Sequence, residues 1–377
     1  MKKTLLFASC LIFTALSYSQ TTVSSSFEYD GAERAYKLYI PEIYDGARPA
    51  PLVFNLHGYG SNNLEQEVYG DFRPIADTAN FIIVHPMGLE DDGGTTHWNT
   101  FGTSSVDDVG FLSALIDTVY ANYNIDGNRI YSTGMSNGGF MSYKLACLLS
   151  GRIAAIASVT GAMTPDEFDA SITNHPMPVM EIHGTDDGTV PYEGNLFFMA
   201  TEEIVAHWVS FNECDTEPIV TEVPDTDASD GCTATHFVYE NGLLGSTVEL
   251  YRINDGGHTW PGSVYGGVGT NNDFSASEEI WRFFSKYTLN VLTSGIEESA
   301  TPTAFMIYPN PTNEAQVTLS FSDNTERNIT IHNSIGQVVL ETVASSSTVE
   351  LNIEDKGIFF VTINQNGAMH TQKLVRN

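Results

Sequence analysis

Short apolar runs and amphipathic stretches alternate along the chain from about residue 36 to residue 287. The runs PLVFNL, FIIVHP and MPVMEI are apolar almost throughout, as in strands that are covered on both faces of a sheet. Between such runs, apolar residues recur every three or four positions, which is typical of amphipathic helices. The pattern predicts an α/β fold with a mostly parallel central sheet and helices on both faces.

The individual elements follow from this pattern. A first hairpin is expected to turn at Asp30-Gly31, and helices are expected at residues 64–80, 106–123, 138–149, 195–211 and 276–287. Further strands are expected at PLVFNLHG, FIIVHP, NRIYSTG, IAAIASVTG, MPVMEIHG and STVELYRIND. Counted from the hairpin, NRIYSTG is the fifth strand, MPVMEIHG the seventh and STVELYRIND the eighth.

The composition changes near residue 290. Residues 291–304 are small, polar and proline-containing, which indicates a linker. From residue 305 to residue 377 only short β patterns occur, among them AQVTLSFS, ERNITIHNS and TVELNIE. The sequence therefore predicts an α/β domain over residues 20–290 and a small all-β sandwich over residues 305–377.

The amino terminus, MKKTLLFASCLIFTALSYSQ, joins two lysines to an apolar stretch that is too short to span a membrane. This pattern predicts a secretory signal peptide over residues 1–19 and an extracellular protein. No later stretch is long and apolar enough to predict a transmembrane segment. We expect the protein to be secreted, either free or attached to the cell surface.

The chain is strongly acidic, with 16 Lys plus Arg against 47 Asp plus Glu and a formal net charge of -31. Such a surface repels phosphate backbones and anionic membranes, so nucleic-acid binding is excluded as a function class. A neutral substrate is compatible with this charge. No His, Cys or carboxylate spacing indicates a metal site and no glycine-rich phosphate loop occurs, so no cofactor is expected.

Three cysteines follow the signal peptide. Cys214 and Cys232 flank a polar, aspartate-rich segment, and an oxidising compartment favours a disulfide between them. Cys147 falls on the apolar face of a predicted helix, where a reduced core residue is expected.

The stretch YSTGMSNGGF places Ser136 between Gly134 and Gly138, after the fifth predicted strand and before a predicted helix. A serine on such a sharp turn is the nucleophile of many serine hydrolases, and glycines beside it prevent collision. The loop after the seventh strand carries Asp186 and Asp187, and the loop after the eighth carries His258. The order Ser, Asp, His along the chain is that of α/β-hydrolases.

Other groups complete the predicted site. The backbone N–H groups of Tyr59, in LHGYG, and Asn137 are candidate donors to a developing oxyanion. Trp98 and Trp260 are candidate aromatic walls of a substrate cleft, with a loop anchor as the alternative for Trp98.

His57 and His183 precede glycines after strands and are expected to be hydrogen-bonded turn residues. Asp107 and Asp108 are expected to cap a helix.

Seven segments, LHGYG, HWN, VDDVGF, GMSNGG, IHGTDDGTVPY, GGHTWPG and SASEEIWRFF, together resemble the polyhydroxybutyrate depolymerase and feruloyl esterase group of secreted α/β-hydrolases. The likeness runs in order from about Leu38 to Tyr287. It implies that Ser136 is the nucleophile, His258 the base and Asp187 the acid. Asp186 stands where that group commonly has a small residue, and Tyr59 stands where it often has a smaller residue such as cysteine.

The segments IYPNPTNEAQVTL, ITIHNSIGQVV and GIFFVTINQNGAMHTQKLV resemble the C-terminal sorting domain of the type IX secretion system. This likeness covers residues 305–377 and implies the secretion machinery as a partner. A row of exposed aromatic residues, as in a polymer-binding module, is not evident in the pattern.

These features predict a secreted serine carboxylesterase that acts through an acyl-enzyme on a polymeric or oligomeric ester. A polyester such as polyhydroxybutyrate is one substrate, and feruloyl or acetyl esters of plant cell-wall polysaccharide are the alternative. A noncatalytic binding protein on a hydrolase fold and a peptidase are the competing function classes.

Overall fold

The computed structural model describes residues 21–169, 173–289, 305–310, 312–321, 323–333, 337–365 and 368–376. Its contacts divide the chain into two compact units, Met1–Ile296 and Glu297–Asn377. The predicted signal peptide at residues 1–19 and the predicted linker at residues 291–304 lie outside the described residues. The α/β unit contains the predicted chemistry.

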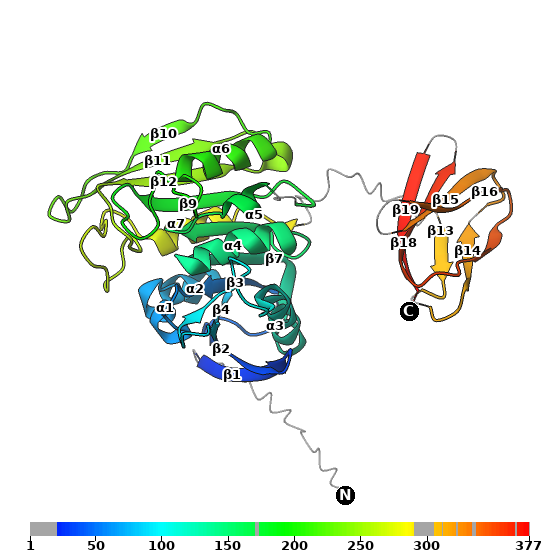
Figure 1. The fold of residues 1–377 in the computed structure, drawn as a ribbon, viewed down its shortest axis with the longest axis horizontal. Helices are drawn as coiled ribbons and strands as arrows, with labels where there is room; N and C mark the ends of the chain where they lie inside the picture. The colour runs from blue at the N-terminus through cyan, green and yellow to red at the C-terminus, as the bar shows by residue number, and fades with distance from the viewer. Residues whose placement is uncertain are drawn as a thin grey trace, which may run out of the picture. The chain divides into compact units, whose positions relative to one another are not determined.

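A ten-stranded sheet runs through the first unit in the order β1-β2-β4-β3-β7-β8-β9-β12-β11-β10 (Figure 1). Its strands are β1 (Thr21–Tyr29), β2 (Ala32–Ile40), β3 (Ala50–Leu56), β4 (Ile82–Pro86), β7 (Ile125–Met135), β8 (Ala155–Val159), β9 (Val179–Gly184), β10 (Ile219–Glu222), β11 (Thr233–Tyr239) and β12 (Val248–Asn254). The six strands from β4 to β12 are parallel, and the two strands at each edge are antiparallel. A separate pair, β5 (Leu89–Glu90) and β6 (Thr96–His97), lies in a loop.

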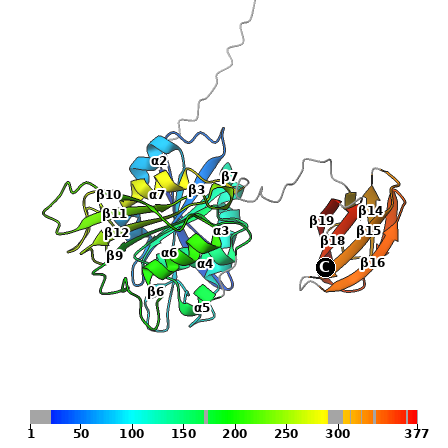
Figure 2. The ribbon, with the colours of Figure 1, turned by 90° about the horizontal axis from the view of Figure 1, so that it is seen from above.

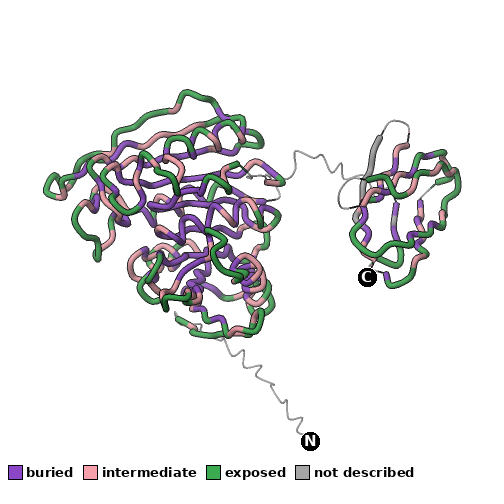
Figure 3. The backbone as a smooth tube through the Cα atoms, in the orientation of Figure 1, coloured by how far each residue is buried: buried purple, intermediate pink, exposed green. Residues whose placement is uncertain are grey.

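Helices cover both faces of this sheet, as Figure 2 shows with the strands between two helical layers. The helices are α1 (Asn63–Tyr69), α2 (Arg73–Ala79), α3 (Asp108–Asn122), α4 (Asn137–Leu148), α5 (Pro165–Asp169), α6 (Thr201–Phe211), α7 (Ala276–Phe284) and the 3-10 turn η1 (Leu243–Gly245). Helices α3, α4 and α6 pack on one core, and α2 and α7 pack on the other. The central strands are buried along most of their length (Figure 3). The α/β prediction is therefore confirmed, and the carboxyl ends of the parallel strands meet at one edge.

The single helix predicted at residues 64–80 is wrong, because the structure forms α1 and α2 with a break between them. Gly70 ends α1, and a Cβ at this position would lie 2.9 Å from the Trp260 ring. Asp71 then accepts the backbone N–H of Arg73, and Pro74 stands in the first turn of α2. The apolar periodicity did not reveal the break because residues of both helices pack on the same core.

The prediction of a disulfide between Cys214 and Cys232 is also wrong, since both cysteines are free and buried. The segment between them contains strand β10, which pairs with β11, and the cysteines lie near opposite ends of the seven-residue β11. That strand separates them by roughly 20 Å at about 3.3 Å per residue, whereas a disulfide needs Cα atoms within about 7 Å. Burial raises the pKa of each thiol to about 11, which makes both unreactive.

The second unit consists of antiparallel strands in two sheets, of orders β13-β14-β17 and β16-β15-β18-β19. Its strands are β13 (Phe305–Tyr308), β14 (Gln316–Phe321), β15 (Arg327–Asn333), β16 (Val338–Ala344), β17 (Thr348–Asn352), β18 (Gly357–Gln365) and β19 (Ala368–Arg376). Alternate residues of these strands form a shared core, including Val317, Ile331 and Val361. The all-β architecture predicted for this part of the chain is confirmed.

Candidate active site

Ser136 occupies the turn between β7 and α4, where its backbone has φ 53° and ψ -118°. A positive φ is strained for a residue with a Cβ and persists only where surrounding contacts enforce it. The Ser136 N–H donates to the carbonyl of Val159 on the neighbouring strand β8 at 2.8 Å, and the Ser136 carbonyl accepts from Gly139 and Phe140 of α4. The serine is thus fixed from both sides at the carboxyl edge of the sheet.

The glycines around Ser136 allow the start of α4 to approach β3 closely. A Cβ at Gly138 would lie 2.2 Å from the carbonyl oxygen of Leu56, and a Cβ at Gly134 would lie 2.6 Å from the same atom. Neither distance is compatible with a side chain, and the neighbouring atoms belong to the backbone. Glycines are therefore required on both sides of Ser136, because the backbone of β3 leaves no room for a side chain at either position.

Asp187 and His258 meet at the same edge of the sheet. Oδ2 of Asp187 accepts a hydrogen bond from Nδ1 of His258 at 2.7 Å, and Oδ1 accepts the N–H groups of Thr189 and Val190, each at 2.8 Å. The Asp187 side chain is fully buried, whereas that of His258 is 20% exposed. Asp186 is exposed, so of the two neighbouring aspartates only Asp187 lies against His258.

Asp187 keeps its negative charge although its side chain is buried. Burial alone would raise the pKa of this carboxyl group, but hydrogen bonds from His183 and His258 hold it far below its usual range. The carboxylate therefore stays ionised, and it can orient His258 and stabilise a positive charge on the imidazole.

The predicted oxyanion donors lie beside the serine. A Cβ at Gly58 would lie 3.5 Å from Cβ of Ser136, which places the loop with Tyr59 next to the nucleophile position. Among the described residues no hydrogen bond engages the backbone N–H of Tyr59 or of Asn137. Likewise, no hydrogen bond from the Ser136 hydroxyl occurs in the described part of the chain, so its contact with His258 stays a prediction. The Tyr59 ring is 58% exposed, and its hydroxyl donates to Asp91 at 2.6 Å.

The prediction that Trp98 is a wall of the substrate cleft is wrong. Trp98 is fully buried, and its indole N–H donates to the carbonyl of His57 at 2.9 Å. Its backbone exchanges hydrogen bonds with the side-chain amide of Asn137. Trp98 is therefore the loop anchor of the alternative interpretation, and it positions the residue that follows Ser136.

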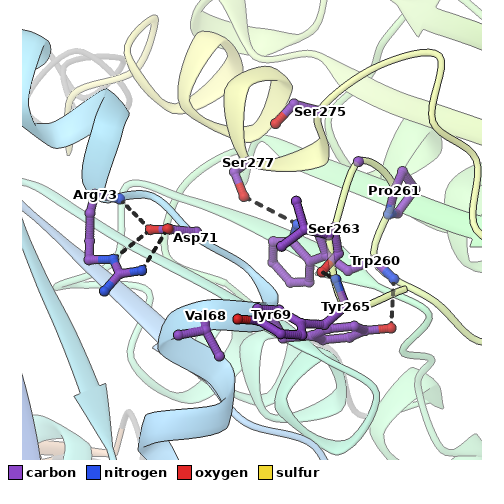
Figure 4. Close-up of a pocket in the computed structure, with 12 residues that line it drawn as sticks. Val68, Tyr69, Asp71, Arg73, Trp260, Pro261, Ser263, Tyr265, Ser275 and Ser277 are labelled. Carbon is purple, nitrogen blue, oxygen red and sulfur yellow. Dashed lines mark hydrogen bonds and ion pairs between the residues drawn. The ribbon is translucent and has the colours of Figure 1, made fainter. Parts of the chain in front are cut away.

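Trp260 is also almost completely buried, with 1% of its surface exposed. Its indole N–H donates to Ser277 at 3.2 Å and its backbone N–H to the hydroxyl of Tyr69 at 3.1 Å. The residue nevertheless lines a small cavity beside the loop that carries His258 (Figure 4). A role for Trp260 in substrate binding stays a prediction.

His57 and His183 are both buried and hydrogen-bonded. Only His57 lies in a loop after its strand, whereas His183 lies within β9, so the prediction of a turn residue is wrong for His183. His57 donates from Nδ1 to the Gly58 carbonyl and accepts the Gly88 N–H at Nε2, and burial lowers its pKa. His183 instead lies between two carboxylates, with Nδ1 2.9 Å from Glu181 and Nε2 3.4 Å from Asp187.

The protonation of His183 follows from these contacts. Nε2 also lies 2.8 Å from the carbonyl of Val190, which can only accept, so this nitrogen carries a proton. Burial opposes a charged imidazole, but hydrogen bonds with Asp187 and Glu181 outweigh it and raise the pKa of His183 to about 9. Glu181 in turn accepts the hydroxyl of Tyr143 at 2.8 Å. No sequence motif marked Glu181, because a lone glutamate inside an apolar strand has no spacing signal.

A second buried ion pair supports the site from the amino-terminal hairpin. Arg34 of β2 donates to Asp108 at 2.5 Å, and both side chains are almost fully buried. The second oxygen of Asp108 accepts the backbone N–H of Asn99, the residue after Trp98. Asp107 caps α3 as predicted, whereas Asp108 pairs with Arg34 rather than acting as the cap. Only the three-dimensional contact could reveal this pair, because its members are far apart in sequence.

No helix of the described residues is long and apolar enough to cross a membrane. Within the same residues, no group of three or more His, Cys, Asp or Glu side chains is arranged to hold a metal ion. The arrangement provides a serine on a strained turn, a histidine oriented by a buried carboxylate, and backbone N–H groups beside them. This combination is suited to nucleophilic attack on a carbonyl group.

Fold and site together define an α/β-hydrolase. The chain belongs to the family described as Esterase PHB depolymerase, whose model matches residues 34–190, and it is a carboxylic ester hydrolase. A second model, described as Secretion system C-terminal sorting domain, matches residues 306–377. The tail is thus a type IX sorting domain, and the protein is exported, to the medium or to the cell surface.

Curated relatives carry esterase names. Feruloyl esterase C of Emericella nidulans is 31% identical over 258 residues, which cover 67% of this chain and 83% of the relative. The probable feruloyl esterase C of Aspergillus niger is 31% identical over 211 residues, or 54% of this chain and 70% of the relative. A bifunctional acetylxylan esterase/xylanase of Neocallimastix patriciarum is 27% identical over 269 residues, but the chain spans only 36% of its length.

Among solved structures, the acetyl xylan esterase from Aspergillus awamori superimposes with a TM-score of 0.51 at 12% identity. The superposition covers 70% of this chain and 99% of that chain. At this identity the likeness bears on the fold, and it confirms the α/β-hydrolase architecture.

We expect Gly138→Ala to destabilise the α/β unit and to reduce esterase activity, because the added methyl group would overlap the backbone of β3. Overpacking of this kind costs roughly 1–3 kcal/mol. Urea unfolding and ester hydrolysis measure both effects. Gly151→Ala is the control, since no heavy atom lies within 4 Å of a Cβ there. Equal stability of the two variants would contradict the packing explanation.

The stability of the α/β unit should fall between about pH 6.5 and pH 9. The pKa of His183 is raised in the folded state above the ordinary value of about 6.5, so its contribution is complete below 6.5 and is lost as the pH rises through 9. The slope for one proton is at most about 1.4 kcal/mol per pH unit. Urea unfolding across this range measures it.

His183→Gln should remove this slope, whatever its effect on total stability. A wild-type protein whose free energy of unfolding is constant from pH 6.5 to pH 9 would show that the imidazole is not held protonated.

Proposed function

We propose that this chain cleaves carboxylic esters through an acyl-enzyme formed on Ser136. The observation that carries this proposal is the 2.7 Å hydrogen bond between buried Asp187 and His258, at the edge where the strained Ser136 turn stands. A serine after β7, a buried carboxylate after β9 and an imidazole after β12 form the constellation that activates a hydroxyl group.

In the first half-reaction, Nε2 of His258 removes the proton of the Ser136 hydroxyl as Oγ attacks the ester carbonyl carbon. The resulting tetrahedral intermediate collapses, the bond to the alcohol oxygen breaks, and His258 gives its proton to the departing alcohol. In the second half-reaction, water attacks the acyl-enzyme while His258 accepts a proton from it. The acid is released, and the same proton returns to Oγ of Ser136.

Asp187 keeps Nδ1–H of His258 directed toward the carboxylate, so that Nε2 is free to accept a proton. It also stabilises the imidazolium that forms in both half-reactions, and it is not itself protonated. The low pKa of Asp187 supports this role, because a carboxyl group that gained a proton would lose its charge when it is needed.

The negative oxygen of the tetrahedral intermediate is proposed to bind the backbone N–H groups of Tyr59 and Asn137. Asn137 is the first residue of the twelve-residue helix α4, whose positive end adds to the stabilisation. Loss of one such donor costs roughly 3 kcal/mol of transition-state stabilisation in other serine hydrolases.

The substrate has two candidates. The family description names a polyhydroxybutyrate depolymerase, whereas the curated relatives carry the names feruloyl esterase and acetylxylan esterase. A polymeric or oligomeric ester suits an exported enzyme in both cases. We expect release of ferulate or acetate from cell-wall esters to exceed release of 3-hydroxybutyrate from soluble oligomers of the polyester. The opposite order, measured with the purified α/β unit, would favour the polyester.

The sorting domain is proposed to bring the chain to the type IX secretion machinery as its partner. Its match covers residues 306–377, a part of the chain distinct from the proposed triad. We therefore assign catalysis to the first unit and export to the second.

Asp187→Asn should lower kcat by about 10⁴-fold, because the amide cannot hold His258 in the required tautomer. Asp186→Asn is the matched control and should leave kcat close to that of the wild type, since Asp186 is exposed and the hydrogen bond to His258 comes from Asp187. Ser136→Ala should abolish both turnover and labelling by a fluorophosphonate probe. Persistent turnover in Ser136→Ala would exclude the acyl-enzyme mechanism and favour a different catalytic group.

A further inference from the structure

His183 contacts the proposed triad without belonging to it. It lies within β9, its side chain is fully buried, and its Nε2 is 3.4 Å from Oδ2 of Asp187. The same oxygen is 2.7 Å from Nδ1 of His258. Two imidazole rings therefore share one carboxylate oxygen. The two nitrogens that face it can be no farther apart than these two distances together, which is about 6 Å.

The carboxylate of Asp187 is held by groups other than His258. Its second oxygen, Oδ1, accepts the N–H groups of Thr189 and Val190. The carbonyl of Val190 lies 2.8 Å from Nε2 of His183, so Val190 joins the loop after β9 to both side chains. Four N–H groups thus surround the carboxylate, about as many as its two oxygens can accept. Three of them do not come from His258, so the position of Asp187 does not depend on His258.

The charge of His183 matters to His258 because both rings lie against the same group. Nδ1 of His183 is 2.9 Å from Glu181, whose side chain is also buried. An imidazolium between the two carboxylates leaves a single negative charge beside His258, whereas a neutral ring beside two carboxylates would leave two. Buried negative charge favours a protonated imidazole, and a protonated His258 cannot accept the proton of Ser136.

The other titratable groups that face His183 are neutral or paired. Burial raises the pKa of Tyr143 on α4 and that of Tyr192, whose ring centroid is 5.9 Å from that of His183, so both hydroxyl groups stay neutral. Arg252 of β12, whose Cα is the partner of that of His183, forms an ion pair with Glu202 of α6 at 3.8 Å. These groups leave the balance of charge beside the triad to His183.

We propose that His183 is a positioning residue of the esterase, which holds Asp187 from β9 and, as a buried imidazolium, keeps His258 unprotonated at neutral pH. The inference rests on the proposed function, because it concerns how the base of that reaction is tuned. Burial opposes the charge on His183, but hydrogen bonds with Asp187 and Glu181 raise its pKa to about 9, which leaves the ring charged at neutral pH.

His183→Gln tests the charge, because the amide can still donate from near the place of Nε2 but carries no charge. The acid limb of the pH profile of kcat/KM, measured on the full chain with a soluble ester, should move to higher pH by roughly one unit. A unit charge about 6 Å away has an effect of this order at an effective dielectric constant of about 20, partly offset by Glu181. At pH values below both midpoints, kcat/KM should be about tenfold lower than in the wild type.

The direction of this shift is the same whether Glu181 keeps or loses its charge in the variant, because Glu181 lies on the far side of the ring at position 183. Tyr192→Phe is the matched control, since it changes a buried neighbour of His183 without removing a charge, and its midpoint should equal that of the wild type. A purely structural role of His183 predicts a lower plateau of kcat/KM with an unmoved midpoint, and that result overturns the proposal.

NMR of the full chain labelled at its histidine nitrogens keeps the test independent of catalysis and of the folding of the variant. Near neutral pH, both ring nitrogens of His183 should carry protons in the wild type, and a His183 ring with a single N–H overturns the proposal. Absence of ester turnover in the wild type would count against the proposed function. A doubly protonated His183, together with a His258 signal that titrates at higher pH in His183→Gln, would still support the coupling of the two rings.

Discussion

The strained backbone of Ser136 is the constraint on which the rest of the site depends. A positive φ at a residue with a side chain persists because β8 holds its N–H and α4 holds its carbonyl. The turn also requires α4 to start against the carboxyl end of β3, and only glycine at positions 134 and 138 permits that distance. Once this junction is formed, the loop after β3 lies beside Ser136 at the start of α4.

Much of this arrangement could be predicted from the sequence, because the relevant signals are local. Unbroken apolar runs identified the parallel strands, and the carboxyl ends of such strands always meet at one edge. These signals predict that Ser136, His258 and the pair Asp186–Asp187 lie near one another. Strand order alone does not choose between the two aspartates. The family resemblance implies Asp187, and the structure agrees, because the turn after β9 directs the Asp187 carboxylate inward to His258.

The errors share a physical cause, which is that nonlocal packing leaves little trace in a sequence. Trp98 looked like a cleft residue because it sits in a polar loop, yet its indole fills the space beneath that loop. Cys214 and Cys232 looked like partners because they flank a polar segment, yet that segment contains the edge strand β10, and the two cysteines lie near opposite ends of its neighbour β11. The pairs Glu181–His183 and Arg34–Asp108 were not predicted. Their importance comes from the burial of their side chains, and burial is a property of the fold.

The pair formed by Arg34 and Asp108 has a consequence for maturation of the protein. Through Asp108, Asn99 and Trp98, the second strand of the amino-terminal hairpin is joined by hydrogen bonds to Asn137. A protease that trimmed the exported chain beyond this strand would leave the Asp108 carboxylate buried without its counter-ion. A buried charge without a partner strongly destabilises the folded protein. The hairpin thus limits where the mature amino terminus can fall. Trimming past it would inactivate the enzyme, although every reacting group would remain in the chain.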